Sequence, residues 1–161
     1  MRKDAKAKME YLKRKNRRNY LIKEISNFTN VTIESLMDME KNDDFCQSVF
    51  RWLSNLNCNI IIKGENDQEN IRCSIQLLKD ILPQFICKKT GRMLFDTGEE
   101  LEAIKVNFDD VNSILEDILV FTKFTTGYGD FILVDDQLKF GICIERTEYH
   151  YELFIWGMTT N

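Results

Sequence analysis

Residues 130–157 of this chain read DFILVDDQLKFGICIERTEYHYELFIWG, and this stretch decides the fold. Two of its runs alternate between apolar and mixed side chains, which is the pattern of half-buried antiparallel strands. The alternating apolar positions are Leu138, Phe140, Ile142 and Ile144 in the first run and Tyr149, Tyr151, Leu153 and Ile155 in the second. A turn centred on Thr147–Glu148 predicts that Ile142 lies opposite Leu153 and Gly141 opposite Phe154. Since Thr-Glu is not favoured turn chemistry, a wider loop is the alternative.

The rest of the chain supplies helices and shorter strands around this meander. Apolar side chains three or four residues apart predict helices over 45–56, over 67–82 with Pro83 at its end, and from 107 or 109 to 119. Short apolar runs predict a buried strand at 60–62 and further strands at 85–88, 93–95 and 104–106. We therefore expect an α+β fold, with helices packed on one side of a mostly antiparallel sheet and a C-terminal β-meander.

Length and composition indicate one folded domain. The 161 residues, 43% of them hydrophobic, are enough to bury one core. The five cysteines are widely spaced and form no Cys-x-x-Cys motif, which favours reduced thiols. No run approaches the ~20 apolar residues of a membrane span, and the basic N-terminus lacks the apolar stretch of a signal peptide. We expect a cytoplasmic protein without a membrane partner, in which residues 1–24 form a basic helical arm or tail and residues 25–161 form the single domain.

The charges of this chain are sorted along its length. Residues 1–24 carry a balance of +7, residues 25–93 a balance of −1, and residues 94–161 a balance of −10. The overall net charge of −4 hides this pattern. An asymmetry of this kind concerns the choice of partner more than the fold.

The basic segment is a candidate nucleic-acid interface. Its densest part contains Lys13, Arg14, Lys15, Arg17 and Arg18, which could neutralise several phosphates if the segment is helical. No helix-turn-helix, zinc finger or aromatic RNA-binding motif accompanies these residues. The alternatives are a solvated tail, or an arm that folds back on the acidic half of the same chain.

The acidic half is a candidate protein-binding surface. Aromatic anchors inside an acidic rim are typical of surfaces that capture basic proteins. The residues that fit this description on the outward face of the hairpin and beside it are Glu145, Glu152, Phe154, Trp156, Asp130, Asp135 and Asp136. The alternative is that a helix covers Phe154 and Trp156, so that the sheet is buried on both faces.

The sequence points away from catalysis and from bound cofactors. His150 is the only histidine and falls within a predicted strand, and no spacing selects a nucleophile to pair with it. Neighbouring carboxylates such as Asp109–Asp110 point apart on a helix or a strand, so they do not form a paired acid–base site. We assign no catalytic residue, no metal site and no cofactor.

Residues 130–157 also resemble the closing meander of small bacterial immunity proteins, which are acidic α+β domains that neutralise toxin domains. The resemblance rests on the strand alternation and on the aromatic strand ends. It implies a non-enzymatic, antitoxin-like inhibitor that binds a basic partner, such as a toxin domain, through its acidic C-terminal half. The competing hypothesis is a nucleic-acid-associated regulator that acts through residues 2–23.

Overall fold

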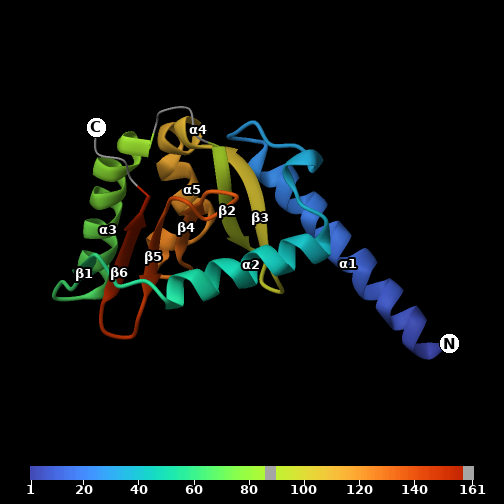
Figure 1. Ribbon diagram of the computed structural model, residues 1–161. Helices are drawn as coiled ribbons and strands as arrows, with labels where there is room; N and C mark the ends of the chain where they lie inside the picture. Colours follow the sequence, from blue (N-terminus) through green and yellow to red (C-terminus); the bar gives the residue numbers. More distant parts are fainter. Residues whose placement is uncertain (86–89, 158–161) are drawn as a thin grey trace.

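A six-stranded antiparallel sheet forms the centre of the protein, which a computed structural model describes at residues 1–85 and 90–157 (Figure 1). The strand order is β1-β6-β5-β4-β2-β3, and every neighbouring pair is antiparallel. The strands are β1 (Ile60–Ile62), β2 (Thr90–Asp96), β3 (Leu101–Asn107), β4 (Phe131–Val134), β5 (Gly141–Arg146) and β6 (Tyr151–Trp156). The predicted α+β class, the antiparallel sheet and the C-terminal meander of β4, β5 and β6 are confirmed.

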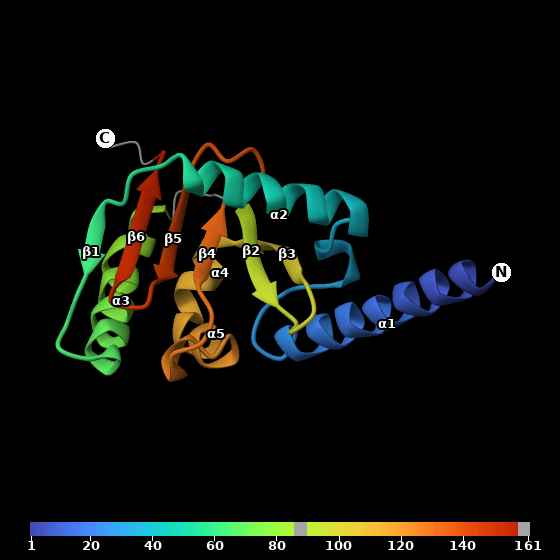
Figure 2. The same ribbon diagram turned by 90° about the horizontal axis from the view of Figure 1, so that it is seen from below.

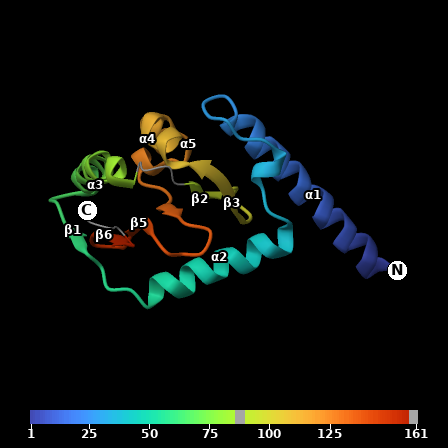
Figure 3. The same ribbon diagram turned by 45° about the horizontal axis from the view of Figure 1, so that its top comes forward.

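Helices cover both faces of the sheet, so the prediction of helices on one side only is wrong (Figure 3). The α-helices are α1 (Arg2–Ile25), α2 (Met39–Ser54), α3 (Asp67–Ile81), α4 (Phe108–Ser113) and α5 (Leu115–Phe121). The last turns of α1 pack with α3, α4 and α5 in the larger apolar core. On the opposite face, Cys46, Val49 and Leu53 of α2 pack on a second core. The second face carries enough apolar side chains, among them Ile132, Cys143 and Phe154, to require a cover of its own.

The hairpin of β5 and β6 has the predicted faces but not the predicted register. Ile142 pairs with Ile155, Ile144 with Leu153 and Gly141 with Trp156, a shift of two residues. A shift of two leaves every side chain on its original face, because side chains alternate with a period of two. The cause is the wider loop between Arg146 and Tyr151, closed by the Thr147 N–H, which donates to the His150 carbonyl at 2.8 Å.

Local signals placed some elements better than others. The strand at Ile60–Ile62 lies where it was predicted, but it is an edge strand in which Ile60 and Ile61 are exposed, so the prediction that it is buried is wrong. The helix after Asn66, whose side chain accepts the Glu69 N–H at 2.9 Å, is as predicted. The helix predicted up to residue 119 is divided into α4 and α5 at Ile114. The predicted strand at 85–88 is not confirmed, because Phe85 lies in a 3₁₀ turn (Leu82–Phe85) and 86–88 are outside the described residues. Instead β2 pairs with β3, a hairpin that the sequence did not predict.

The outer edge of β3 is closed by α2. The Asn42 side chain is fully buried and donates to the Leu101 carbonyl at 2.9 Å, while its oxygen accepts the Ala103 N–H at 2.8 Å. This amide supplies two of the backbone hydrogen bonds that a seventh strand would make. The other edge strand, β1, is only three residues long, and short edge strands limit unwanted strand pairing.

Candidate functional site: an acidic pocket beside α2

A small pocket lies where the second half of α2 crosses β4 and β5. It has a volume of about 100 Å³. We call it the acidic pocket; it is lined by Phe50, Leu53, Ser54, Asp130, Ile132, Cys143 and Glu145. Figure 2 shows α2 running crosswise to the strands, and its apolar contacts place it on one face of the sheet. The pocket has an apolar floor and two carboxylates at its rim.

Sheet pairing brings a third carboxylate to the same place. Glu145 and Glu152 are direct cross-strand partners in β5 and β6, and side chains opposite each other share a face. Asp130 accepts the Arg146 backbone N–H at 2.9 Å, and Glu152 lies 3.2 Å from Nε2 of His150. In the part of the chain that the structure describes, no lysine or arginine side chain forms an ion pair with any of these three carboxylates.

This arrangement makes the charged forms of Asp130 and Glu145 less favourable. Burial raises the pKa of Asp130, although the backbone N–H and the charge of Arg146 oppose the shift. Burial also raises the pKa of Glu145, and the nearby charges of Asp130 and Glu152 raise it further. A cation placed among the three groups would relieve both their repulsion and their loss of hydration.

A half-buried arginine, Arg146, anchors the segment that leads into Asp130. The Arg146 guanidinium lies over the rings of Phe124 and Tyr151, with its central carbon 4.4 and 4.6 Å from their centroids. It donates to the carbonyls of Phe124 and Gly129 and to the Tyr151 hydroxyl, which in turn donates to Asp67. Burial raises the pKa of Tyr151 to about 12, so this hydroxyl keeps its proton at neutral pH. The network holds the segment that leads into Asp130 against α3 and β6.

The predicted aromatic anchors have structural roles. Phe154 is 5% exposed and packs in the core beneath α2, so it is not a surface anchor. Trp156 is half-buried, donates its indole N–H to the Leu138 carbonyl at 2.9 Å, and lies 6.5 Å from Trp52 between ring centroids. Its ring covers Gly141, where an added Cβ would come within 2.6 Å of the indole. The alternative, in which a helix covers this face, is therefore correct for Phe154 and in part for Trp156.

The two remaining predicted carboxylates lie at the opposite end of β4. Asp135 accepts the backbone N–H groups of Gln137 and Lys139 at 3.2 and 3.1 Å, which is the behaviour of a turn-forming residue. Asp136 forms an ion pair with Arg92 at 2.8 Å. Of the predicted binding residues, the structure thus brings together Asp130, Glu145 and Glu152, and separates Asp135, Asp136 and the two aromatics from them.

Three arginines of the basic segment, Arg14, Arg17 and Arg18, are engaged within the molecule. Glu102 of β3 is completely buried and accepts from Nε of Arg14 at 3.1 Å and from Nε of Arg18 at 3.0 Å. Arg14 also donates two hydrogen bonds to Asp43, and these raise the pKa of Arg14 and lower that of Asp43. Arg17 donates twice to Glu100, at 2.7 and 2.9 Å. The alternative of an arm that folds back on the chain's own acidic half is therefore correct for Arg14, Arg17 and Arg18. Lys13 and Lys15 stay exposed.

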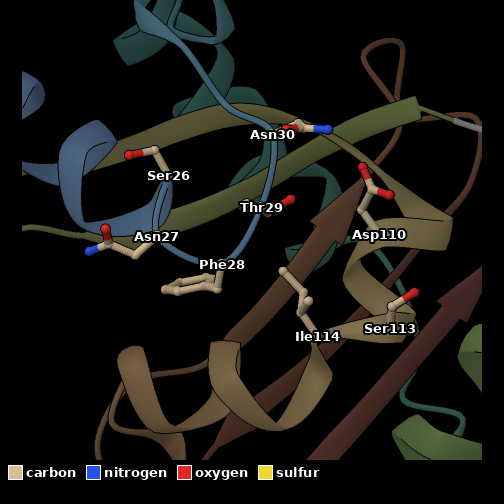
Figure 4. Close-up of a pocket in the computed structure, with 8 residues that line it drawn as sticks. All are labelled: Ser26, Asn27, Phe28, Thr29, Asn30, Asp110, Ser113 and Ile114. Atoms are coloured by element: carbon tan, nitrogen blue, oxygen red, sulfur yellow. The ribbon is translucent and has the colours of Figure 1, made fainter.

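Larger depressions lie elsewhere on the surface. Figure 4 shows one of about 360 Å³ between the loop after α1 and α4, with Phe28 and Ile114 side by side and the polar groups of Ser26, Asn30 and Asp110 around them. None of its eight lining residues is a histidine, a cysteine, a lysine or an arginine. Another, of about 740 Å³, lies between α1 and Phe121.

Cys143 contributes the thiol that lines the acidic pocket. Burial raises the pKa of the Cys143 thiol well above its usual value, and the charges of Asp130 and Glu145 add to this effect, so the thiol stays protonated. Among the described side chains, no group of three or more His, Cys, Asp or Glu is arranged to hold a metal ion. The described cysteines Cys46, Cys58, Cys73 and Cys143 are free thiols. No helix within residues 1–85 and 90–157 combines the length and apolar character needed to cross a bilayer.

Sequence reasoning missed the apolar residues around these carboxylates. Phe50 is 42% exposed because it falls off the buried stripe of α2 formed by Cys46, Val49 and Leu53. Ile61 is 62% exposed and lies opposite Glu152 in the pairing of β1 with β6. A large apolar residue outside the buried stripe of its helix was the available signal for Phe50.

Comparison with known proteins identifies a family. The model of the YxiF protein family matches residues 21–156, which include every residue of the acidic pocket. The match leaves out residues 1–20, which include most of α1. No curated protein and no solved structure matches the chain. Because the family model covers most of its length, this chain belongs to the YxiF protein family.

Proposed function

We propose that this protein is a non-enzymatic binding domain, of the immunity or antitoxin type, that captures a basic region of a partner protein at the acidic pocket. One observation carries the proposal: Asp130, Glu145 and Glu152 converge beside exposed Phe50 without an ion pair to any described lysine or arginine. A basic side chain from a partner would neutralise the carboxylates, and its aliphatic stem would lie against Phe50. The free thiols are in keeping with a cytoplasmic location.

The exposed apolar area beside the carboxylates favours a protein partner over a small cation. The carboxylates form only one part of the exposed face, and Phe50 and Ile61 extend it with apolar area that an inorganic ion cannot use. In protein interfaces, acidic groups at the rim speed association, whereas desolvated apolar contacts slow dissociation. The arrangement thus fits a folded basic partner, as a toxin domain would be.

The arginines on which the nucleic-acid hypothesis most depends already form ion pairs within the molecule. Arg14, Arg17 and Arg18 already pair with Asp43, Glu100 and Glu102, so phosphates would have to compete with these carboxylates. The cations of the segment that remain exposed are mostly lysines, which bind phosphate as point charges without the paired hydrogen bonds of arginine: Arg2, Lys3, Lys6, Lys8, Lys13, Lys15 and Lys23. We therefore rank a nucleic-acid regulator second.

Affinity capture from the native host tests the proposal. The wild-type chain is compared with the double variant Glu145→Gln/Glu152→Gln and with the control Glu99→Gln/Asp117→Asn, which changes the net charge equally at exposed positions away from the pocket. We expect the wild type and the control to retain the same basic protein, and the pocket variant to bind it roughly 10- to 100-fold more weakly once it is purified. Equal binding by all three forms, or capture of nucleic acid alone, would reject the proposal.

A further inference from the structure

The first half of α1 extends beyond the domain as an arm, which we define as residues 2–13 (Figures 1 and 3). Every side chain of the arm is exposed. Three of them are large and apolar: Met9 is 57% exposed, Tyr11 54% and Leu12 48%. A short helix that nothing covers gains little stability from its own backbone, so exposed apolar groups on it indicate a surface that binds something.

Met9 and Leu12 belong to a stripe that continues along the whole helix. Met9, Leu12, Asn16 and Tyr20 follow each other at intervals of three or four residues and therefore share one face of α1. Tyr20 is 65% exposed. This face lies opposite the one that carries Arg18, Leu21 and Ile25 into the domain.

The far end of the stripe forms one wall of the 740 Å³ groove. Asn16, Tyr20 and Leu21 stand on the α1 side of this groove, and Thr97 and Phe121 on the other. The charged groups in it are Arg17, Glu24, Asp96 and Lys123, and Arg17 is already neutralised by Glu100. The helix α1 thus carries an exposed apolar stripe on its arm and, about two turns further on, one wall of a groove that is partly apolar.

We propose that the arm of each molecule binds in the groove of a second copy, so that two α1 helices pack antiparallel in a symmetric dimer. In this arrangement Met9 of each copy lies against Tyr20 of the other, and Leu12 lies near Asn16 and Arg17. The contact is self-complementary: if residue 9 meets residue 20, then residue 20 meets residue 9, and the assembly closes after two copies.

The charges favour this occupant. The arm holds Arg2, Lys3, Lys6, Lys8 and Lys13 against only Asp4 and Glu10. Antiparallel packing brings Lys6 toward Glu24 and Asp96, the two carboxylates of the groove. A parallel pair of arms would instead align the lysines with each other, which like-charge repulsion opposes.

The oligomeric state of the full chain tests the inference, by light scattering after gel filtration and by sedimentation equilibrium. We expect the protein to form a reversible dimer as its concentration is raised to about 0.2 mM. Both Met9→Gln/Leu12→Gln and Tyr20→Gln should raise the dissociation constant at least roughly 100-fold, because each dimer contains the change twice. Tyr11→Gln is the matched control: this side chain is equally exposed but lies off the stripe, so the dimer should persist.

Several results would overturn the inference. The inference fails if the wild-type protein is still a monomer at about 0.2 mM, even if its arm binds DNA or an acidic protein. It also fails if both stripe variants leave the dimer unchanged. The outcome is independent of the proposed function, because the stripe variants leave the acidic pocket intact and capture of the basic partner remains measurable with them.

Discussion

Replacing Arg18 by methionine tests how the N-terminal helix is held. Arg18 is 8% exposed and donates to Glu102, whose side chain is fully buried, at 3.0 Å. In Arg18→Met, Arg14 is the only cation left beside Glu102 among the residues that the structure describes, and Asp43 competes for it. Removing one partner from a buried ion pair costs about 3–5 kcal/mol, and the remaining arginine places this case near 3 kcal/mol. For a protein of this size that corresponds to a fall in melting temperature of roughly 6–12 °C.

Arg17→Met is the matched control, since it removes the same kind of side chain one position away. The Arg17–Glu100 pair is partly exposed, so its loss should cost less than about 1 kcal/mol. Chemical denaturation with circular dichroism measures both variants, and adding Glu102→Gln to Arg18→Met should restore part of the loss because the buried charge is then absent. Equal stabilities for Arg17→Met and Arg18→Met would refute the reasoning. A truncation of residues 1–18 should destabilise the protein for the same reason.

Three further changes probe the pocket and the sheet. Glu145→Gln should stabilise the free protein by a few tenths of a kcal/mol at neutral pH. The gain should disappear as the pH falls through the raised folded-state pKa of Glu145 toward the ordinary glutamate value, because the carboxyl is then protonated in the wild type as well. Thermal melts at several pH values measure this loss. Asn42→Ala should cost about 2–3 kcal/mol and speed hydrogen exchange of the Ala103 amide, whose acceptor it removes; an unchanged exchange rate would contradict the proposed edge closure. Trp156→Ala should cost about 2–3 kcal/mol in urea unfolding because Gly141 loses its cover; a loss below ~0.5 kcal/mol would place the ring outside the core.

The alternation of apolar residues was sufficient to place the faces of the last hairpin but not its register. Ile142 and Ile144 lie in the larger core as expected, because any even shift preserves their side of the sheet. The register depended on the loop after Arg146, whose residues carry no strong turn signal. The sequence also did not decide whether a helix covers the other face. Cys143, Phe154 and Trp156 share that face with Gly141 and Glu145, and such a mixture suits either a solvated or a half-covered surface.

Long-range ion pairs were beyond local reasoning. Arg14 and Arg18 are separated from Glu102 by more than 80 residues, and no periodicity links them. The hint was a glutamate within the apolar run Leu101–Val106, where a buried charge needs a partner from elsewhere. In the acidic pocket, the sequence identified Asp130, Glu145 and Glu152 because charge is visible in composition. It did not identify Phe50, because exposure depends on how α2 lies on the sheet.

The most direct test of the central claim is hydrogen–deuterium exchange of the complex with the captured basic partner. If the acidic pocket is the binding site, backbone amides in residues 48–54, 130–132 and 143–152 should become protected on binding, whereas those of residues 2–13 should not change. Protection confined to α1, with residues 130–132 and 143–152 unaffected, would contradict the account.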